Sequence, residues 1–116
     1  MTLARSSLCV ALLLLLPVCG GDGDPPEPCS DPVAAATVEL ADFEFRPDCL
    51  LADAGATIAL ENTGDAPHTF TVEGTDVDLD LEVGTSADAS LSGVDPGDYA
   101  VTCTFHPQME ATLTVE

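Results

Sequence analysis

The segment Tyr99-Ala-Val-Thr-Cys103-Thr-Phe-His106-Pro-Gln-Met109, close to the C-terminus, carries three side chains that can bind a metal ion. Its thiol, imidazole and thioether follow one another at three-residue spacing, and such soft and borderline donors suit copper. A second imidazole, His68, lies earlier in the chain, in Asn62-Thr-Gly-Asp-Ala-Pro-His68-Thr-Phe70. These are the only two histidines among 116 residues, so the chain can supply two imidazoles, a thiolate and a thioether to one site.

Two histidines, one cysteine and a weak axial methionine are the ligands of blue copper electron-transfer centres. The order also agrees, because one histidine comes from the middle of the chain and the other three ligands come from one later loop. On these residues the chain resembles a small cupredoxin of the plastocyanin/azurin family from about residue 37 to residue 116. Its short Cys-x2-His-x2-Met loop is most similar to the loops of amicyanin and pseudoazurin.

The resemblance implies one type 1 copper ion and gives each ligand a role. Cys103 would supply the thiolate bond and the electronic coupling, and His68 and His106 would complete the trigonal plane. Met109 would be the weak axial ligand that helps to set the reduction potential. Each residue also has a simpler explanation, as a surface histidine, a small buried cysteine or a core methionine.

The resemblance further implies that His106 has a ring edge near solvent, through which electrons would pass. The usual docking face of the family is an apolar patch around this histidine, and Pro67, Phe105 and Pro107 could form it here. Phe105 could equally point into the core. Family members often carry Asn directly after the first histidine, whereas Thr69 stands there in this chain, so the hydrogen bonds around the ligands are expected to differ.

Two residues near the predicted ligands have smaller predicted roles. Asn62 is expected to form a turn through its local backbone, and the resemblance would let it brace the His68 loop. Tyr99 follows a turn and resembles a tyrosine corner, with plain strand packing as the alternative.

The N-terminus is typical of an export signal. Residues 1–18 carry one cation, Arg5, and an apolar run from Leu8 to Leu16 that is too short to cross a bilayer as a stable helix. The run ends in Pro17-Val18-Cys19, which resembles a bacterial lipoprotein processing site, with ordinary signal cleavage nearby as the alternative. We therefore expect an exported protein, periplasmic or at the cell surface, with Cys19 as the lipidation site that anchors it to a membrane.

The length leaves room for one domain after this signal. Residues 19–32 are rich in Gly, Pro and Asp and are expected to form a flexible linker. Residues 33–116 are expected to form the cupredoxin-like copper-binding domain.

Cysteine usage favours a disulfide in an oxidising compartment. Once Cys9 is placed in the signal, Cys19 at the lipid and Cys103 at the metal, Cys29 and Cys49 remain as a pair. Their bridge would contribute about 3 kcal/mol by restricting the unfolded chain. A free thiol, or a bridge to Cys19, is the alternative.

The net charge of −19, with two Arg and no Lys, would repel nucleic acid and anionic lipid headgroups, so we expect neither as a partner. The acids could attract a cationic redox protein, or they could serve general solubility. Because they are spread from Asp22 to Glu116, the second interpretation is favoured.

Short runs with two-residue alternation predict an all-β fold, a Greek-key β-sandwich of six to eight strands without helices. The first strand should span Thr37 to Phe45, and its alternation changes parity near Ala41-Asp42, which predicts a β-bulge.

The expected function is that of a monomeric single-electron carrier outside the cytoplasmic membrane. Its partner would be a redox protein such as a cytochrome or a copper enzyme. The alternative is a copper-binding protein for delivery or sequestration. We expect no enzyme, because a copper oxidase or reductase needs further histidines, and a Cys103/His106 hydrolase would lack a third orienting group.

Overall fold

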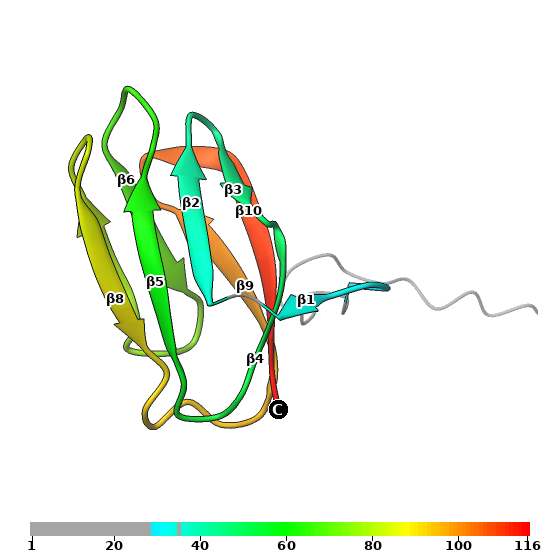
Figure 1. Ribbon diagram of the computed structural model, residues 1–116. Coiled ribbons are helices and arrows are strands. Elements are labelled where there is room, and N and C mark those ends of the chain that lie inside the picture. The colour runs from blue at the N-terminus through cyan, green and yellow to red at the C-terminus, as the bar shows by residue number, and fades with distance from the viewer. Residues whose placement is uncertain (1–28, 35) are drawn as a thin grey trace, which may run out of the picture.

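A computed structural model describes residues 29–34 and 36–116 of the chain. These residues form two β-sheets packed face to face, and no helix occurs among them (Figure 1). The strands are β1 (Val33–Ala34), β2 (Thr37–Ala41), β3 (Glu44–Arg46), β4 (Cys49–Ala52), β5 (Thr57–Asn62), β6 (His68–Val72), β7 (Asp78–Leu81), β8 (Ser86–Ser90), β9 (Gly97–Cys103) and β10 (His106–Val115).

The larger sheet has the strand order β1-β4-β10-β9-β6-β7, and the smaller has the order β3-β2-β5-β8. Both sheets are mixed, because β4 runs parallel to β10 and β2 runs parallel to β5. The predicted all-β sandwich is confirmed. The predicted number of strands was too low, since the short strands β1 and β3 bring the count within the described residues to ten.

The predicted bulge near Ala41-Asp42 is wrong, because the chain reverses there. β2 and β3 pair in antiparallel fashion, with Ala41 opposite Glu44, and Asp42 and Phe43 form the turn between them. Phe43 adopts a positive φ of 70°, which places it in the left-handed region. A two-residue turn changes the apparent parity of apolar residues just as a bulge does, which explains why the pattern was misread.

The core lies between the two sheets and is built from every second residue of the strands. Phe45 and Phe70 meet there edge to face, with ring centroids 5.9 Å apart. Tyr99 packs against this core, and its hydroxyl donates a hydrogen bond to the carbonyl of Asp95 at 2.6 Å, as in a tyrosine corner. Both sheets contribute fully buried aliphatic residues, among them Val38, Leu40, Ile58, Leu60, Leu50, Val101 and Leu113.

A disulfide joins Cys29 to Cys49, the pairing predicted from the sequence, with the two Cα atoms 5.8 Å apart. It ties the beginning of the described chain to β4. The predicted signal peptide at residues 1–18, the lipidation site Cys19 and most of the predicted linker lie outside the described residues.

Within residues 29–34 and 36–116, the structure contains no helix with the length and apolar character needed to span a membrane.

The strand directions bring four segments to one end of the sandwich. β9 is antiparallel to both β6 and β10, so the end of β9 lies beside the beginnings of the other two. β2 runs parallel to β5, whose last residue leads into the loop before β6. The β2–β3 turn therefore lies at the same end as the starts of β6 and β10 (Figure 1).

Candidate metal centre

A short hairpin between β9 and β10 carries Cys103 and His106. The two residues are paired across the hairpin, with Thr104 and Phe105 as the turn. The next pair is Thr102 with Glu110, so the three residues 107–109 bulge out of β10. β10 thus begins at His106, before this bulge.

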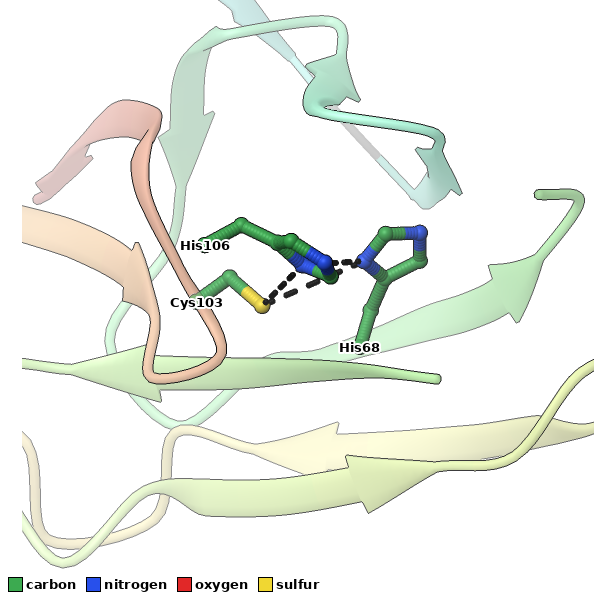
Figure 2. Close-up of side chains that lie close together, drawn as sticks. All are labelled: His68, Cys103 and His106. Atoms are coloured by element: carbon green, nitrogen blue, oxygen red, sulfur yellow. Dashed lines mark hydrogen bonds between the residues drawn. The ribbon is translucent and has the colours of Figure 1, made fainter. Parts of the chain in front are cut away.

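The donor atoms of His68, Cys103 and His106 converge in one cluster, shown in Figure 2, and all lie within 4.8 Å of one another. The two Nδ1 atoms are 3.2 Å apart. The sulfur of Cys103 lies 3.4 Å from Nδ1 of His106 and 3.9 Å from Nδ1 of His68. Three of the four residues predicted as metal ligands are therefore together.

The cluster has the size and the chemistry of a metal site. A triangle with these three sides has a centre about 2 Å from each corner, close to the usual bond lengths of transition metals to imidazole nitrogen and thiolate sulfur. One thiolate with two imidazoles is the equatorial donor set of a type 1 copper site. The residues present therefore fit a single copper ion.

Met109 lies in the bulge that follows His106. Its side chain is fully buried and belongs to the hydrophobic core cluster that also contains Cys103. Its neighbours in the bulge, Pro107 and Gln108, are exposed. Its role as the axial ligand remains a prediction.

Cys103 is the free cysteine of the described residues, and only 2% of it is exposed. Its sulfur accepts a hydrogen bond from the backbone N–H of Thr69 at 3.3 Å. The hydroxyl of Thr69 accepts a hydrogen bond from the backbone N–H of Thr104 at 2.9 Å. Thr69, where the resemblance led us to expect Asn, thus links the segments that present His68 and Cys103.

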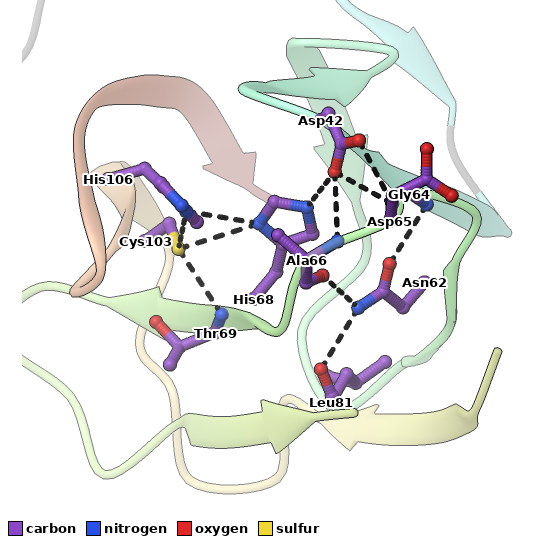
Figure 3. A network of polar contacts seen from close by, with 10 residues as sticks. All are labelled: Asp42, Asn62, Gly64, Asp65, Ala66, His68, Thr69, Leu81, Cys103 and His106. Atoms are coloured by element: carbon purple, nitrogen blue, oxygen red, sulfur yellow. Dashed lines mark hydrogen bonds and ion pairs between the residues drawn. The ribbon is translucent and has the colours of Figure 1, made fainter. Parts of the chain in front are cut away.

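His68 is completely buried, and a carboxylate contacts the ring nitrogen that faces away from the cluster. Nε2 of His68 lies 3.2 Å from Oδ1 of Asp42, which belongs to the β2–β3 turn (Figure 3). The Asp42 carboxylate also accepts hydrogen bonds from the backbone N–H groups of Asp65 and Ala66, at 2.9 and 3.2 Å. The Asp65 amide is the main cause that lowers the pKa of Asp42 from 3.8, with His68 and Ala66 adding to this effect and burial opposing it.

The buried side chain of Asn62 holds the loop before His68 through hydrogen bonds to backbone groups. Its side-chain amide donates to the carbonyls of Ala66 and Leu81, at 2.9 and 3.0 Å, and its carbonyl oxygen accepts from the N–H of Gly64 at 2.9 Å. Both roles predicted for Asn62, a local turn and a brace, are therefore present.

His106 lies at the surface of the cluster and is half-buried. The ring of Phe43 meets it edge-on, with centroids 4.9 Å apart, although 54% of Phe43 is exposed. Pro67, Phe105 and Pro107, the residues predicted for a docking face, are all exposed.

Asp42 and Phe43 were not among the site residues predicted from the sequence. One of 21 acidic residues has no distinguishing spacing from the ligands, and both residues were assigned to a continuous strand. The parity change at Ala41-Asp42 was the available signal, because it marked the position of the turn.

Comparisons with known proteins agree with this geometry. A family model described as a cupredoxin-like domain matches residues 9–115. The methylamine utilization protein MauL of Methylophilus methylotrophus is 30% identical over an alignment 115 residues long, which covers 94% of this chain and 66% of that protein. The chain therefore spans about two thirds of the length of this relative.

Solved structures share the fold. A mutant plastocyanin of fern has a TM-score of 0.61 and 26% identity, over 70% of this chain and 100% of the other. A reduced amicyanin variant has a TM-score of 0.59 and 23% identity, over 80% of this chain and 100% of the other. Since the family model matches nearly the whole sequence, the chain belongs to the cupredoxin-like family.

Proposed function

We propose that this protein is a blue copper protein that carries single electrons. The observation that carries the proposal is the convergence of one thiol sulfur and two imidazole Nδ1 atoms within 4.8 Å, at the end of a rigid β-sandwich. When bound, a copper ion would supply the one-electron change between Cu(II) and Cu(I). The protein's contribution is to hold the donors in one arrangement and to control access to them.

The described residues are suited to holding the donors and to controlling access to them. His68 and Cys103 are buried, so water is kept from two of the donors. The N–H group of Thr69 donates a hydrogen bond to the Cys103 sulfur and so helps to fix the position of that sulfur. Buried Met109 is proposed as the weak axial ligand. Half-buried His106 gives a partner an approach to the site that His68 does not offer.

The partner is proposed to be a redox protein, such as a cytochrome or a copper enzyme, that docks on the apolar surface around His106. The three residues expected there from the sequence, Pro67, Phe105 and Pro107, are exposed. Exposed Phe43 is added to this docking face. Nucleic acid is not a proposed partner, because the net charge of −19 would repel it. We propose that the carrier acts as a monomer.

We place the protein outside the cytoplasmic membrane, periplasmic or at the cell surface. The signal-like residues 1–18 support export, and Cys19 is the proposed lipid anchor. The disulfide between Cys29 and Cys49 suits an oxidising compartment.

We propose no enzymatic activity. Both histidines of the chain belong to the one cluster, so none is left for a second copper centre at which a substrate could react.

The test is to add one equivalent of Cu(II) to the purified protein and to record visible absorption and electron spin resonance spectra. We expect an intense blue thiolate charge-transfer band and a narrow copper hyperfine splitting, both lost in Cys103→Ala. An ordinary pale Cu(II) spectrum that persists in Cys103→Ala would contradict the proposal. Fast electron self-exchange without loss of copper would support a carrier, whereas transfer of copper to an acceptor on reduction would favour delivery.

A further inference from the structure

We propose that Asp42 is a positioning residue of the copper site. It holds the His68 ring so that Nδ1 faces the thiolate, and its negative charge favours Cu(II) over Cu(I). This inference rests on the proposed function, because it concerns how the same site is tuned. No sequence motif connects the two residues, which lie 26 positions apart.

The Asp42 carboxylate is itself fixed by the backbone. Its Oδ1 and Oδ2 atoms each lie 2.9 Å from the N–H of Asp65, and Oδ1 also accepts from the N–H of Ala66. These amides belong to the loop that leads into His68. The carboxylate therefore ties the β2–β3 turn to the His68 loop and presents Oδ1 to the imidazole at a fixed position.

This contact determines which nitrogen of His68 carries the proton. An ionised carboxylate can only accept hydrogen bonds, so Nε2 of His68, 3.2 Å from Oδ1, must be the donor. In the neutral ring Nδ1 then keeps its lone pair. Nδ1 is the atom that lies 3.2 Å from Nδ1 of His106 and 3.9 Å from the Cys103 sulfur, so the free lone pair faces the cluster.

The charge of Asp42 acts on the site through the same contact. A carboxylate hydrogen-bonded to the far side of a ligand imidazole makes that ligand more electron-rich. The Asp42 carboxylate would therefore stabilise Cu(II), the more highly charged ion, relative to Cu(I). The Asp42 side chain is 32% exposed, so solvent reduces this effect without removing it.

Gly64 provides independent support for a contact built into the fold. A Cβ atom at position 64 would lie 2.2 Å from Oδ1 of Asp42 and 2.9 Å from Nε2 of His68. Five other described glycines have a positive φ, but Gly64 is not one of them. Its lack of a side chain is thus explained by the space that the carboxylate and the imidazole occupy.

The experiment compares Asp42→Asn with Asp65→Asn at the same ionic strength. Both variants lose one negative charge near the His68 loop. The Asp65 side chain is exposed, however, and only its backbone N–H contacts the Asp42 carboxylate. Asparagine keeps the shape and an acceptor oxygen. Binding of Cu(II) and of Cu(I) is measured by competition with chelators, and the reduction potential is measured in parallel.

We expect Asp42→Asn to weaken Cu(II) binding by about 10–100-fold, to weaken Cu(I) binding less, and so to raise the potential. Asp65→Asn should show only the smaller effect of an exposed charge. Equal changes in the two variants, or an Asp42→Asn protein with unchanged affinities, would overturn the proposal.

A second measurement needs no substitution and no copper. Nitrogen-15 NMR of the metal-free protein, at a pH well above the ordinary histidine pKa of about 6.5, shows which nitrogen of His68 is protonated. We expect the proton on Nε2, and a proton on Nδ1 would overturn the proposal even if Asp42→Asn failed to fold. Because this result does not depend on a blue spectrum, failure of the positioning role can be told apart from failure of the proposed function.

Discussion

The two histidines of the cluster offer the same donor atom in opposite surroundings. His68 is completely buried, its Nε2 contacts Asp42, and its loop is braced by Asn62. His106 follows a two-residue turn, is half-buried, and packs in a T-shaped arrangement against the exposed ring of Phe43. His68 is thus buried with a carboxylate at its far nitrogen, whereas the His106 ring is partly exposed at the surface of the cluster.

This difference separates two tasks that a redox site must combine. A fixed donor keeps the arrangement of ligands constant while the charge of the metal changes, which limits rearrangement for each electron. An accessible donor lets a partner come close to the metal. We propose that the first task belongs to the His68 side and the second to the His106 side, and substitutions can test this assignment.

Removing each imidazole in turn should give the largest effect. His68→Gly and His106→Gly should both lose the blue spectrum, because each lacks one of the three equatorial donors. Free imidazole should restore the spectrum in His106→Gly, where the empty position opens toward solvent. It should not do so in His68→Gly, where the position is closed by the loop and by Asp42.

The measurement is a titration of each copper-loaded variant with imidazole, followed by visible absorption, with the unaltered protein as the control. Equal restoration in both variants would show that the two sides are equally accessible, and the comparison would fail.

The His106 side was the more predictable one from the sequence. Cys103, His106 and Met109 occur within seven residues, so their spacing reports the ligand set directly. The alternation of apolar residues likewise predicted most of the strands, because burial of one sheet face imposes a two-residue period. The predicted Cys29–Cys49 pair followed from counting cysteines.

The His68 side was only partly predictable, because its contacts come from distant parts of the chain. Asp42 reaches His68 through the β2–β3 turn, and the position of that turn depends on the parallel pairing of β2 with β5. Leu81 contributes only a carbonyl to Asn62, and backbone groups leave no mark on the sequence. The spacing of residues in the sequence can reveal a loop of metal ligands. The residues that contact those ligands come from other strands and can be identified only once the fold is known.

The braces of the two sides should differ strongly in their effect on stability. Asn62→Ala removes three hydrogen bonds, one of them to the buried carbonyl of Leu81, so we expect a loss of about 3 kcal/mol in the free energy of unfolding. Gln108→Ala, in the exposed bulge after His106, should change it by less than about 0.5 kcal/mol. Urea unfolding of the metal-free proteins measures both. Similar losses would mean that the His106 side is braced as firmly as the His68 side.

A smaller effect is expected where the two sides are joined. Thr69→Val keeps the N–H group that donates to the Cys103 sulfur but removes the hydroxyl that accepts from the N–H of Thr104. We expect a loss of about 1–2 kcal/mol in the free energy of unfolding, with the blue band retained. Thr102→Val is the matched control, because its hydroxyl bonds an exposed carboxylate. Loss of the band in Thr69→Val would show that the hydroxyl, and not the backbone, supports the thiolate.

The smallest effect is expected at Phe43, the outer neighbour of His106. Its left-handed backbone costs a residue with a Cβ about 1–2 kcal/mol, and an aromatic edge contact returns about 0.5–1.5 kcal/mol, so the two nearly cancel. Phe43→Ala loses the contact and keeps the strain, whereas Phe43→Gly loses both. Phe43→Gly should therefore be more stable than Phe43→Ala by about 1 kcal/mol and close to the unaltered protein. If urea unfolding instead ranks both variants equally and well below the unaltered protein, the ring contact stabilises the His106 side more than its exposure suggests, and the two histidines are less different than their surroundings indicate.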